Sequence, residues 1–185
     1  MSDSKSSGGT SVEVLAEFKG TDLNDLCDAA EAAISDGGGF GWVRRPPRHI
    51  MESYWKGVLL VPDRRLFVAR LDGTIAGSAV LVRPPRNNEA QAFAAHLTGM
   101  FVAPWARNRG LGRQIAELAE MTARELGVEV LNLDVRDTQA AAIRLFESLG
   151  YRRWGRHPAY ARVSGKIVSG HFLWKPLTES LKAEP

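Results

Sequence analysis

The order of hydrophobic patterns along the chain predicts an α/β or α+β domain built around a mixed sheet. Strand-type and helix-type patterns follow one another as strand, two helices, three strands, helix, strand, helix and two strands. A chain of 185 residues is long enough for one domain with a substantial core, and no internal repeat or linker interrupts the pattern. We therefore expect a single domain over residues 12–185.

In the first half of the chain, capping and turn-forming residues separate the expected elements. Thr21 or Asp22 can cap the start of a helix, and the glycines at 37–39 end it. The pair Asp72-Gly73 between two apolar runs is a strong signal for a tight hairpin. The expected elements are a strand over residues 12–18, helices over 22–34 and 49–60, and hairpin strands over 66–71 and 74–82.

In the second half, proline and glycine mark where elements stop. Pro104 ends an apolar run, while Gly127 and Gly150 follow helix-type patterns. The expected elements are a central strand over residues 93–103, a helix over 113–126, a strand over 128–135, a helix over 139–149, and strands over 151–160 and 165–177.

Composition excludes several classes of protein. Lys+Arg 24 against Asp+Glu 21 gives a net charge of +3, which is too weak for nucleic-acid binding driven by counterion release, so no nucleic-acid partner is expected. The longest aliphatic run, residues 58–61, is too short to span a membrane, so no membrane association is expected. The single cysteine, Cys27, excludes an intrachain disulfide and lies at a helix position typical of a small buried side chain.

The first eleven residues differ from the rest of the chain. Residues 1–11 are rich in Ser and Gly and lack the apolar stretch of a secretory signal. Such a composition cannot offset the entropy lost on ordering. We therefore expect residues 1–11 to be a disordered tail and the protein to be cytoplasmic.

The segment Arg107-Asn108-Arg109-Gly110-Leu111-Gly112 carries the clearest functional signal. It follows an apolar run and opens a helix pattern. The first N–H groups of a helix have no partners within it, and the helix dipole adds partial positive charge there. Glycine lets a phosphate approach the backbone without a Cβ in the way. The segment therefore predicts a phosphate-binding loop.

Common nucleotide loops do not fit this segment. A Walker loop needs Lys and then Ser or Thr after the last glycine, whereas Arg113 and Gln114 follow here. A dinucleotide fingerprint needs a third glycine at the position of Ile115, and the order of elements differs from a Rossmann fold.

The spacing Arg-x-x-Gly-x-Gly after Val102-Ala103-Pro104 resembles the pyrophosphate loop of the GNAT superfamily of acetyl-CoA-dependent N-acetyltransferases. The segment from Gln139 to Tyr151 resembles a second family motif, Asn-x-x-Ala-Ile-x-Leu-Tyr-Glu-x-x-Gly-Phe. With these two motifs, the resemblance to the family covers roughly residues 12–177. It implies a GNAT-like mixed, mostly antiparallel sheet of about seven strands with splayed central strands and about four flanking helices.

The resemblance also implies the reaction and the residues that hold the co-substrate. An acetyl group would pass from acetyl-CoA to a primary amine by direct attack in a ternary complex, without a metal. The strand before the loop would pair with the pantetheine arm through Met100 and Val102. The implied cofactor-binding residues are Met100, Phe101, Val102, Arg107, Asn108, Arg109, Gly110, Leu111, Gly112, Arg113, Gln139 and Phe146.

Two residues are candidates for proton transfer. Strand alternation places Asp134 on a polar face with Asn132, where some relatives carry a glutamate proposed as base; a structural carboxylate is the alternative. Phe146 replaces a tyrosine whose hydroxyl can reach the CoA sulfur, so Tyr160 is the candidate acid, with half-buried packing as its alternative. His96 is expected to be a satisfied sheet histidine.

His157 and His171 lack metal-ligand spacing, and no metal site is expected.

The acceptor and the partners stay open at this level. Trp42, Glu52 and Trp55 could hold a cationic or apolar amine, although Trp55 fits a core position equally well. Arg44, Arg45 and Arg48 could instead hold a carboxylate or phosphate. A small-molecule amine, a peptide amine and a homodimer all remain compatible with the sequence.

The alternative function is a CoA-responsive binding module with little catalytic activity, because Phe146 has no proton to donate.

Overall fold

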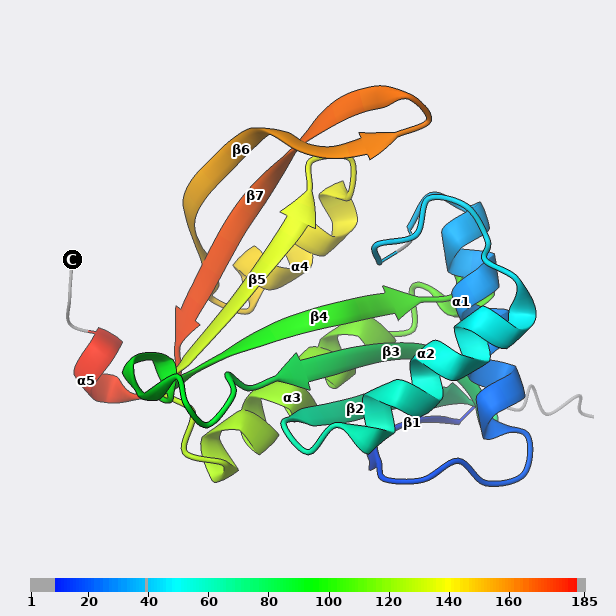
Figure 1. The fold of residues 1–185 in the computed structure, drawn as a ribbon, viewed down its shortest axis with the longest axis horizontal. Helices are drawn as coiled ribbons and strands as arrows, with labels where there is room; N and C mark the ends of the chain where they lie inside the picture. The colour runs from blue at the N-terminus through cyan, green and yellow to red at the C-terminus, as the bar shows by residue number, and fades with distance from the viewer. Residues whose placement is uncertain (1–8, 39, 183–185) are drawn as a thin grey trace, which may run out of the picture.

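Seven strands form one sheet in the order β1-β2-β3-β4-β5-β7-β6, and every neighbouring pair is antiparallel except β4 and β5, which run parallel (Figure 1). The computed structural model describes residues 9–38 and 40–182. The strands are β1 Thr10–Leu15, β2 Arg64–Leu71, β3 Thr74–Val82, β4 Ala94–Val102, β5 Val130–Arg136, β6 Arg152–Val163 and β7 Lys166–Pro176. The helices are α1 Asp22–Ser35, α2 Arg48–Leu60, α3 Leu111–Glu125, α4 Ala140–Ser148 and the short α5 Glu179–Lys182, with 3₁₀ turns at Glu89–Gln91 and Pro104–Ala106.

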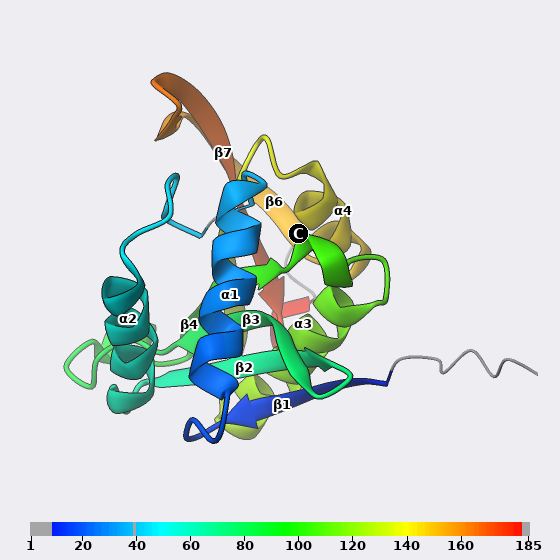
Figure 2. The ribbon, with the colours of Figure 1, turned by 90° about the vertical axis from the view of Figure 1, so that its right-hand side faces the viewer.

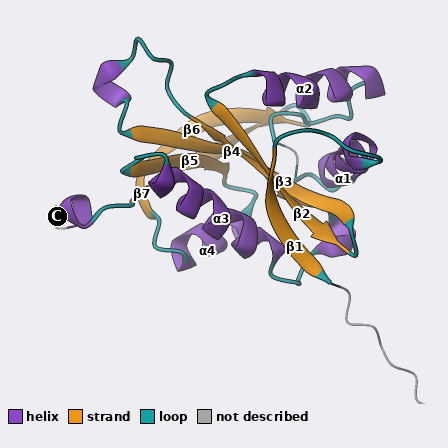
Figure 3. Ribbon diagram, turned by 90° about the horizontal axis from the view of Figure 1, so that it is seen from below, coloured by secondary structure: helices purple, strands orange, loops and turns teal. Residues whose placement is uncertain are grey.

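The helices cover the two faces of the sheet in pairs. Helices α1 and α2 lie on one face, and α3 and α4 lie on the other (Figure 3). The apolar side of α1, with Leu26 and Ala30, packs on the first face, and the apolar side of α3, with Ile115 and Ala119, packs on the second. The β6–β7 hairpin projects beyond α1 and α2, so the end of the sheet that it forms carries no helix on that face (Figure 2).

The sheet opens between its two parallel strands. Pairing of β4 with β5 covers only residues 94–96 against 130–132. Beyond His96, β4 continues along β3 while β5 continues along β7, and the two strands diverge (Figure 1). Gly99, with φ of 59°, lies where the β3–β4 register shifts, a backbone conformation that favours glycine. This bulge bends β4 and leaves one of its edges without a neighbouring strand.

The observed elements follow the predicted order. The fold class and the splayed mixed sheet expected from the sequence are confirmed, with shifts of a few residues at element ends. Cys27 is fully buried as expected, and burial raises the pKa of its thiol to about 11. Within residues 9–38 and 40–182, no helix combines the length and apolar character that a membrane crossing requires.

The boundary expected for the N-terminal tail is wrong in part. Thr10 and Ser11, placed in a disordered tail, belong to β1 and pair with Leu71 and Arg70. Backbone pairing with an edge strand orders them, and Gly9 continues that pairing, because its carbonyl accepts from the N–H of Asp72 at 2.9 Å. Low apolar content was therefore not a sufficient basis for predicting disorder at Thr10 and Ser11. The rest of the expected tail, residues 1–8, lies outside the described residues.

Candidate active site

The glycine loop turns directly into helix α3. Asn108 and Gly110 both have positive φ, 61° and 76°, and the helix starts at Leu111. No side chain caps this helix start. The N–H groups of its first turn therefore stay available for an anion.

A cavity of about 600 Å³, called here the glycine-loop cavity, lies in front of this helix start. Its walls come from the end of α1, from β4, from the loop before α3 and from the start of α4. They comprise Asp36, Gly38, Met100, Phe101, Val102, Ala106, Arg107, Asn108, Gly110, Leu111, Gly112, Arg113, Thr138, Gln139, Ala141, Ala142 and Leu145.

Most residues that the sequence motifs assign to the co-substrate line this cavity, with two exceptions. Arg109 is exposed and does not line it, and Phe146 lines the neighbouring cavity instead.

The two glycines of the motif have different structural reasons. Gly110 is required by its positive φ, and the space beside it is open apart from the side chain of Gln114. A Cβ on Gly112 would lie 3.3 Å from Cδ2 of Leu145 and 3.7 Å from Cε of Met100. Gly112 thus lets α3 approach α4 and β4 closely, so the cavity wall can form there.

The open edge of β4 faces the same cavity. The N–H of Ala103 donates to the carbonyl of Ala76 on β3 at 2.8 Å. Alternation then directs the backbone groups of Met100 and Val102 away from β3, toward the side that β5 has left. The Arg107 side chain occupies part of this edge, because its Nε donates to the carbonyl of Val102 at 3.2 Å.

The end of α1 closes one side of the glycine-loop cavity. Arg107 forms an ion pair with Asp36, and Nε2 of Gln139 donates to the carbonyl of Gly37 at 2.9 Å. These contacts join three segments that are distant in sequence: the end of α1, the glycine loop and the start of α4. A ligand that enters the cavity meets both side chains.

A second cavity of about 330 Å³, called here the central cavity, lies between the diverging ends of β4 and β5. It adjoins the glycine-loop cavity, because Gly38, Met100, Gln139 and Ala142 line both. Its other lining residues are Phe40, Gly41, Leu97, Thr98, Gly99, Leu133, Asp134, Val135, Arg136, Phe146 and Tyr160.

Three polar side chains meet at the central cavity. The hydroxyl of Tyr160 on β6 donates to Oδ2 of Asp134 on β5. Nε2 of His96 on β4 lies 2.9 Å from Oδ1 of the same carboxylate. The sequence predicted Asp134 and Tyr160 as separate candidates, and the structure joins them through one hydrogen bond.

The contacts of the Asp134 carboxylate change its pKa. Hydrogen bonding from His96 is the main cause that lowers the pKa of Asp134, burial opposes it, and the hydroxyl of Tyr160 lowers it further. Burial and the neighbouring Asp134 carboxylate raise the pKa of the Tyr160 phenol. At neutral pH the cluster therefore holds an ionised carboxylate and a protonated phenol.

Gly170 on β7 leaves the space that the Tyr160 ring occupies. The Tyr160 ring lies so close to β7 that a Cβ on Gly170 would lie 2.3 Å from its Cγ. No side chain larger than hydrogen fits beneath the ring. The register between β6 and β7 shifts between His157 and Ala161, next to this contact.

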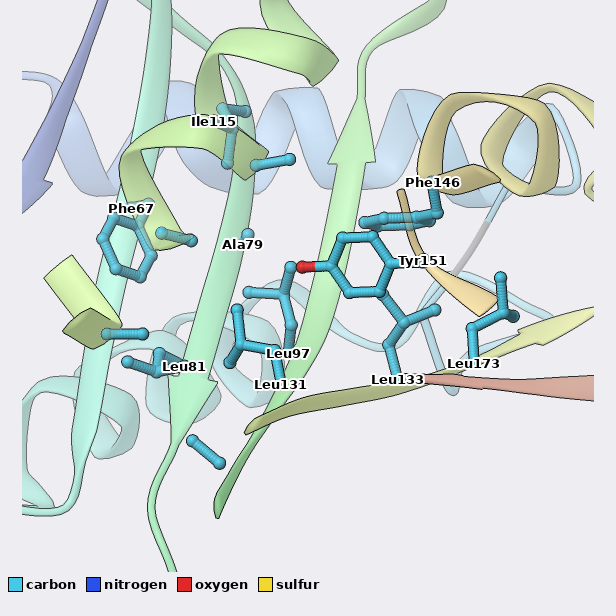
Figure 4. Close-up of a cluster of buried hydrophobic side chains, with 14 of the residues drawn as sticks. Phe67, Ala79, Leu81, Leu97, Ile115, Leu131, Leu133, Phe146, Tyr151 and Leu173 are labelled. Carbon is cyan, nitrogen blue, oxygen red and sulfur yellow. The ribbon is translucent and has the colours of Figure 1, made fainter. Parts of the chain in front are cut away.

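Phe146 belongs to the wall between the core and the central cavity. It is 4% exposed and packs edge to face on Tyr151 (Figure 4). Leu133 and Leu173 lie in the same cluster of buried side chains (Figure 4). An apolar ring here keeps this wall of the cavity dry.

The expected acceptor residues lie in different surroundings. Trp55 is fully buried, so it offers no surface to an acceptor and the expectation for it is corrected. Glu52 forms an ion pair with Arg48 at 3.5 Å. Trp42 is half-buried and packs edge to face on Tyr54 and on Phe40, behind the lining of the central cavity, to which it does not itself belong.

Sequence reasoning missed two features of the site. His96 was expected to be a satisfied sheet histidine, and its contact with Asp134 agrees with that, but the sequence did not show that its partner is the candidate carboxylate. Phe40, which stacks on Phe101 with ring centroids 5.0 Å apart, lines the central cavity and was not singled out. The alternation of His96 with Ala95 and Leu97 was visible in the sequence, but the parallel register that brings it to β5 was not.

A polar clamp beside the site was also missed. Asp137, at the end of β5, contacts His171 at 2.9 Å and accepts a hydrogen bond from Ser169. These bonds hold its pKa at about 2, with the Ser169 hydroxyl as the main cause and His171 next. The clamp fixes the turn that carries Thr138 and Gln139 into the glycine-loop cavity.

Comparison with known proteins places this geometry among acetyltransferases. The model of the Acetyltransferase (GNAT) family matches residues 28–151. An uncharacterized N-acetyltransferase in the hisH–hisA intergenic region of Azospirillum brasilense is 64% identical over 128 residues, covering 69% of this chain and 76% of that protein. The IAA acetyltransferase of the same organism is 31% identical over 119 residues, covering 64% and 72%.

Among solved structures, yncA, a putative acetyltransferase from Salmonella typhimurium with its cofactor acetyl-CoA, superposes with a TM-score of 0.75. The match covers 92% of this chain and 95% of that chain at 18% identity, which shows a shared fold.

Proposed function

The chain belongs to the GNAT family and is an N-acetyltransferase, and from that premise we propose that it transfers the acetyl group of acetyl-CoA directly to a primary amine in a ternary complex. The observation that carries this proposal is the junction of two cavities at the open edge of β4. One presents a helix start suited to a diphosphate, and the other presents Asp134 and Tyr160, with His96 in contact with Asp134. The thioester would lie where the two cavities join.

The residues of the glycine-loop cavity fit coenzyme A. The free first turn of α3 and the nearby Arg113 suit the diphosphate. The backbone of Met100 and Val102 suits the amides of the pantetheine arm, which can pair like an added strand. The Nε contact of Arg107 with Val102 would have to yield to the arm, which leaves the guanidinium free for a phosphate oxygen.

The amine needs a base, and we assign that role to His96 with Asp134 as its partner. A carboxylate whose pKa is lowered is a weak base, whereas an imidazole changes charge in the physiological range. With Nε2 turned to Asp134, Nδ1 of His96 is left to accept the ammonium proton, directly or through water. Asp134 would orient the imidazole and stabilise its charged form.

The neutral nitrogen attacks the thioester carbonyl, a C–N bond forms, and the C–S bond breaks to release CoA thiolate. Once His96 has released the first proton to solvent, it can accept the second proton of the nitrogen as the amide forms. Thiols titrate near pH 8.5, so the thiolate leaves without obligatory protonation. Tyr160 is the hydroxyl that could protonate it, in place of the one that Phe146 lacks.

The test is thiol release from acetyl-CoA across a panel of amines, measured beside CoA binding by calorimetry. Turnover with at least one amine, lost in His96→Gln while CoA affinity is kept, would support the proposal. Tight CoA binding with no turnover on any amine would instead favour a CoA-responsive binding module. The absence of an aromatic hydroxyl at Phe146 is the observation that keeps this alternative in view.

A further inference from the structure

On the α2 side of the sheet, a cavity of about 710 Å³, called here the outer cavity, lies beside the base of the splay. The loop that connects β3 to β4 forms one wall, with Arg83 and Phe93, and Trp154 and Phe172 of the last two strands form another. Figure 3 shows this loop on the side of the sheet that carries α2. Neither sequence motif includes these residues.

The outer cavity leads to the candidate base. His96 lines it and also contacts Asp134 in the central cavity. Leu133 lines both cavities. From Ala94 to Thr98 the strand β4 rises about 13 Å, at roughly 3.3 Å per residue. A molecule that lies along β4 in the outer cavity can therefore extend one end to the His96–Asp134 pair.

The outer cavity is lined in part by the aromatic side chains of Phe93, Trp154 and Phe172, and two of these are exposed. Trp154 is 65% exposed and Phe93 is 44% exposed, although both are large apolar side chains. The rings of Trp154 and Phe172 lie 5.5 Å apart. Exposed aromatic side chains around a hollow are typical of a surface that buries an apolar ligand.

The charge of the outer cavity is one-sided. Arg83 is half-buried and lines it, and none of the lining residues is Asp or Glu. Among the described residues, no carboxylate pairs with the Arg83 guanidinium. The other polar side chains that line it are the amides of Asn88, Gln91 and Asn132 and the imidazole of His96. A half-buried guanidinium without a carboxylate partner suits an anionic group on the ligand.

We propose that the outer cavity is the acceptor site, and that it takes an elongated amine with a flat apolar body and a carboxylate or similar anion at the end remote from the nitrogen. The anion pairs with Arg83, the body lies between Phe93 and Trp154, and the amine reaches His96. This inference rests on the proposed acetyl transfer to an amine. It moves the acceptor away from the region of Trp42 and Glu52.

The test uses two probes that share the amine and the ring: 4-(2-aminoethyl)benzoate and its methyl ester, in which a methyl group replaces the negative charge at the remote end. For the benzoate, Arg83→Gln should raise KM roughly 10- to 100-fold with little change in kcat, the size expected for loss of a charged hydrogen bond. For the ester, the same substitution should change KM less than about threefold. Arg83→Lys should recover part of the preference.

A matched control comes from the same loop. Arg86 is exposed and does not line the outer cavity, so Arg86→Gln should leave both KM values unchanged. Trp154→Ala should raise KM for both probes, because it removes the aromatic wall and keeps the charge. Equal effects of Arg83→Gln and Arg86→Gln on the benzoate would overturn the proposal.

Failure of the proposal can be separated from failure of acetyl transfer itself. If wild-type protein acetylates other amines but neither probe, the acceptor class is wrong. If no amine is acetylated, calorimetry of 4-(2-aminoethyl)benzoate with CoA-saturated protein decides. Binding that Arg83→Gln abolishes would keep the site and remove the reaction, and absence of binding would overturn the site as well.

Discussion

The glycine-loop cavity and the face around His96 are built in different ways. The first takes its main features from backbone: a helix start, a strand edge, and glycines that shape both. The second takes its features from side chains on β4, β5 and β6, which only the sheet brings together. Backbone recognition of a constant ligand can be encoded by a short motif, whereas an acceptor face can change one side chain at a time.

Substitution of the side-chain cluster should give the largest loss of activity. Asp134→Asn removes the charge that orients and stabilises the His96 imidazole, and it should lower kcat/KM roughly 10²- to 10⁴-fold. His96→Gln should lower kcat/KM by a similar factor. CoA affinity should hold in both variants, because neither residue lines the glycine-loop cavity.

The two variants, Asp134→Asn and His96→Gln, also discriminate between two assignments of the base. If Asp134 accepts the amine proton through water, Asp134→Asn should be severe while His96→Gln stays near normal. If His96 is the base, both are severe and their combination is little worse than either alone. Near-normal turnover in both variants would contradict the assignment of proton transfer to this cluster.

A substitution in the glycine loop should affect CoA binding in the glycine-loop cavity and not the side chains around His96. Gly110 has positive φ, which Asn and Asp tolerate better than other side chains, so Gly110→Asn and Gly110→Asp form a matched pair. Only Asp adds a negative charge at the helix start. We expect Gly110→Asp to weaken CoA binding about 10- to 30-fold more than Gly110→Asn, corresponding to up to ~2 kcal/mol. Equal affinities by calorimetry would contradict a diphosphate at this helix start.

The same division explains what the sequence could predict. The order of elements and the glycine loop follow from local patterns, such as Asp72-Gly73 for the hairpin and Gly110 before α3. The role of His96 does not, because it depends on the parallel register of β4 with β5 and on the bulge at Gly99. The register has no local sequence signature, and a single glycine within a strand pattern indicates a bulge without showing which strand edge it opens.

Burial, too, depends on neighbours that periodicity alone does not identify. Trp55 and Trp42 both belong to aromatic segments near α2, yet one is fully buried and the other half-buried. The outer cavity depends on a loop and two late strands, and no sequence pattern links Arg83 to Trp154. The residues that line the glycine-loop cavity were therefore easier to predict than those that line the outer cavity.

Substitution of Gly170 should have a smaller effect, because it acts on the Tyr160–Asp134 contact only by displacing the Tyr160 ring. Gly170→Ala places a Cβ within 2.3 Å of the Tyr160 ring, which must shift and carry its hydroxyl away from Asp134. We expect a destabilisation of about 1–3 kcal/mol from overpacking. The loss in kcat should be several-fold and match that of Tyr160→Phe, because both variants lose the same hydroxyl contact.

A control for the glycine substitution lies in α2, where a Cβ on Gly57 would meet nothing within 4 Å. Gly57→Ala should leave kcat unchanged and stabilise the fold slightly, as alanine does within a helix. If Gly170→Ala lowers kcat when Tyr160 is already Phe, the glycine acts on more than the hydroxyl. Thermal unfolding and steady-state kinetics on the four single and double variants separate these cases.

The smallest expected effect concerns the clamp at Asp137, which holds the turn before α4 by contacts with Ser169 and His171. Its pKa of about 2 lies below the value of about 3.9 for an unfolded aspartate. A carboxyl with a lowered pKa in the fold stabilises the protein above the unfolded pKa, and this stabilisation is lost as the pH falls from about 4 to about 2. Asp137→Asn should therefore have a lower Tm than wild type at pH 7, and the difference in Tm should narrow as the pH falls from about 4 to about 2.

Other carboxylates with lowered pKa, such as Asp134, titrate in both proteins and cancel in the difference. A gap in Tm that stays constant from pH 7 to pH 2 would show that Asp137 acts through shape alone, and that its charge does not hold the turn that presents Gln139 to the glycine-loop cavity.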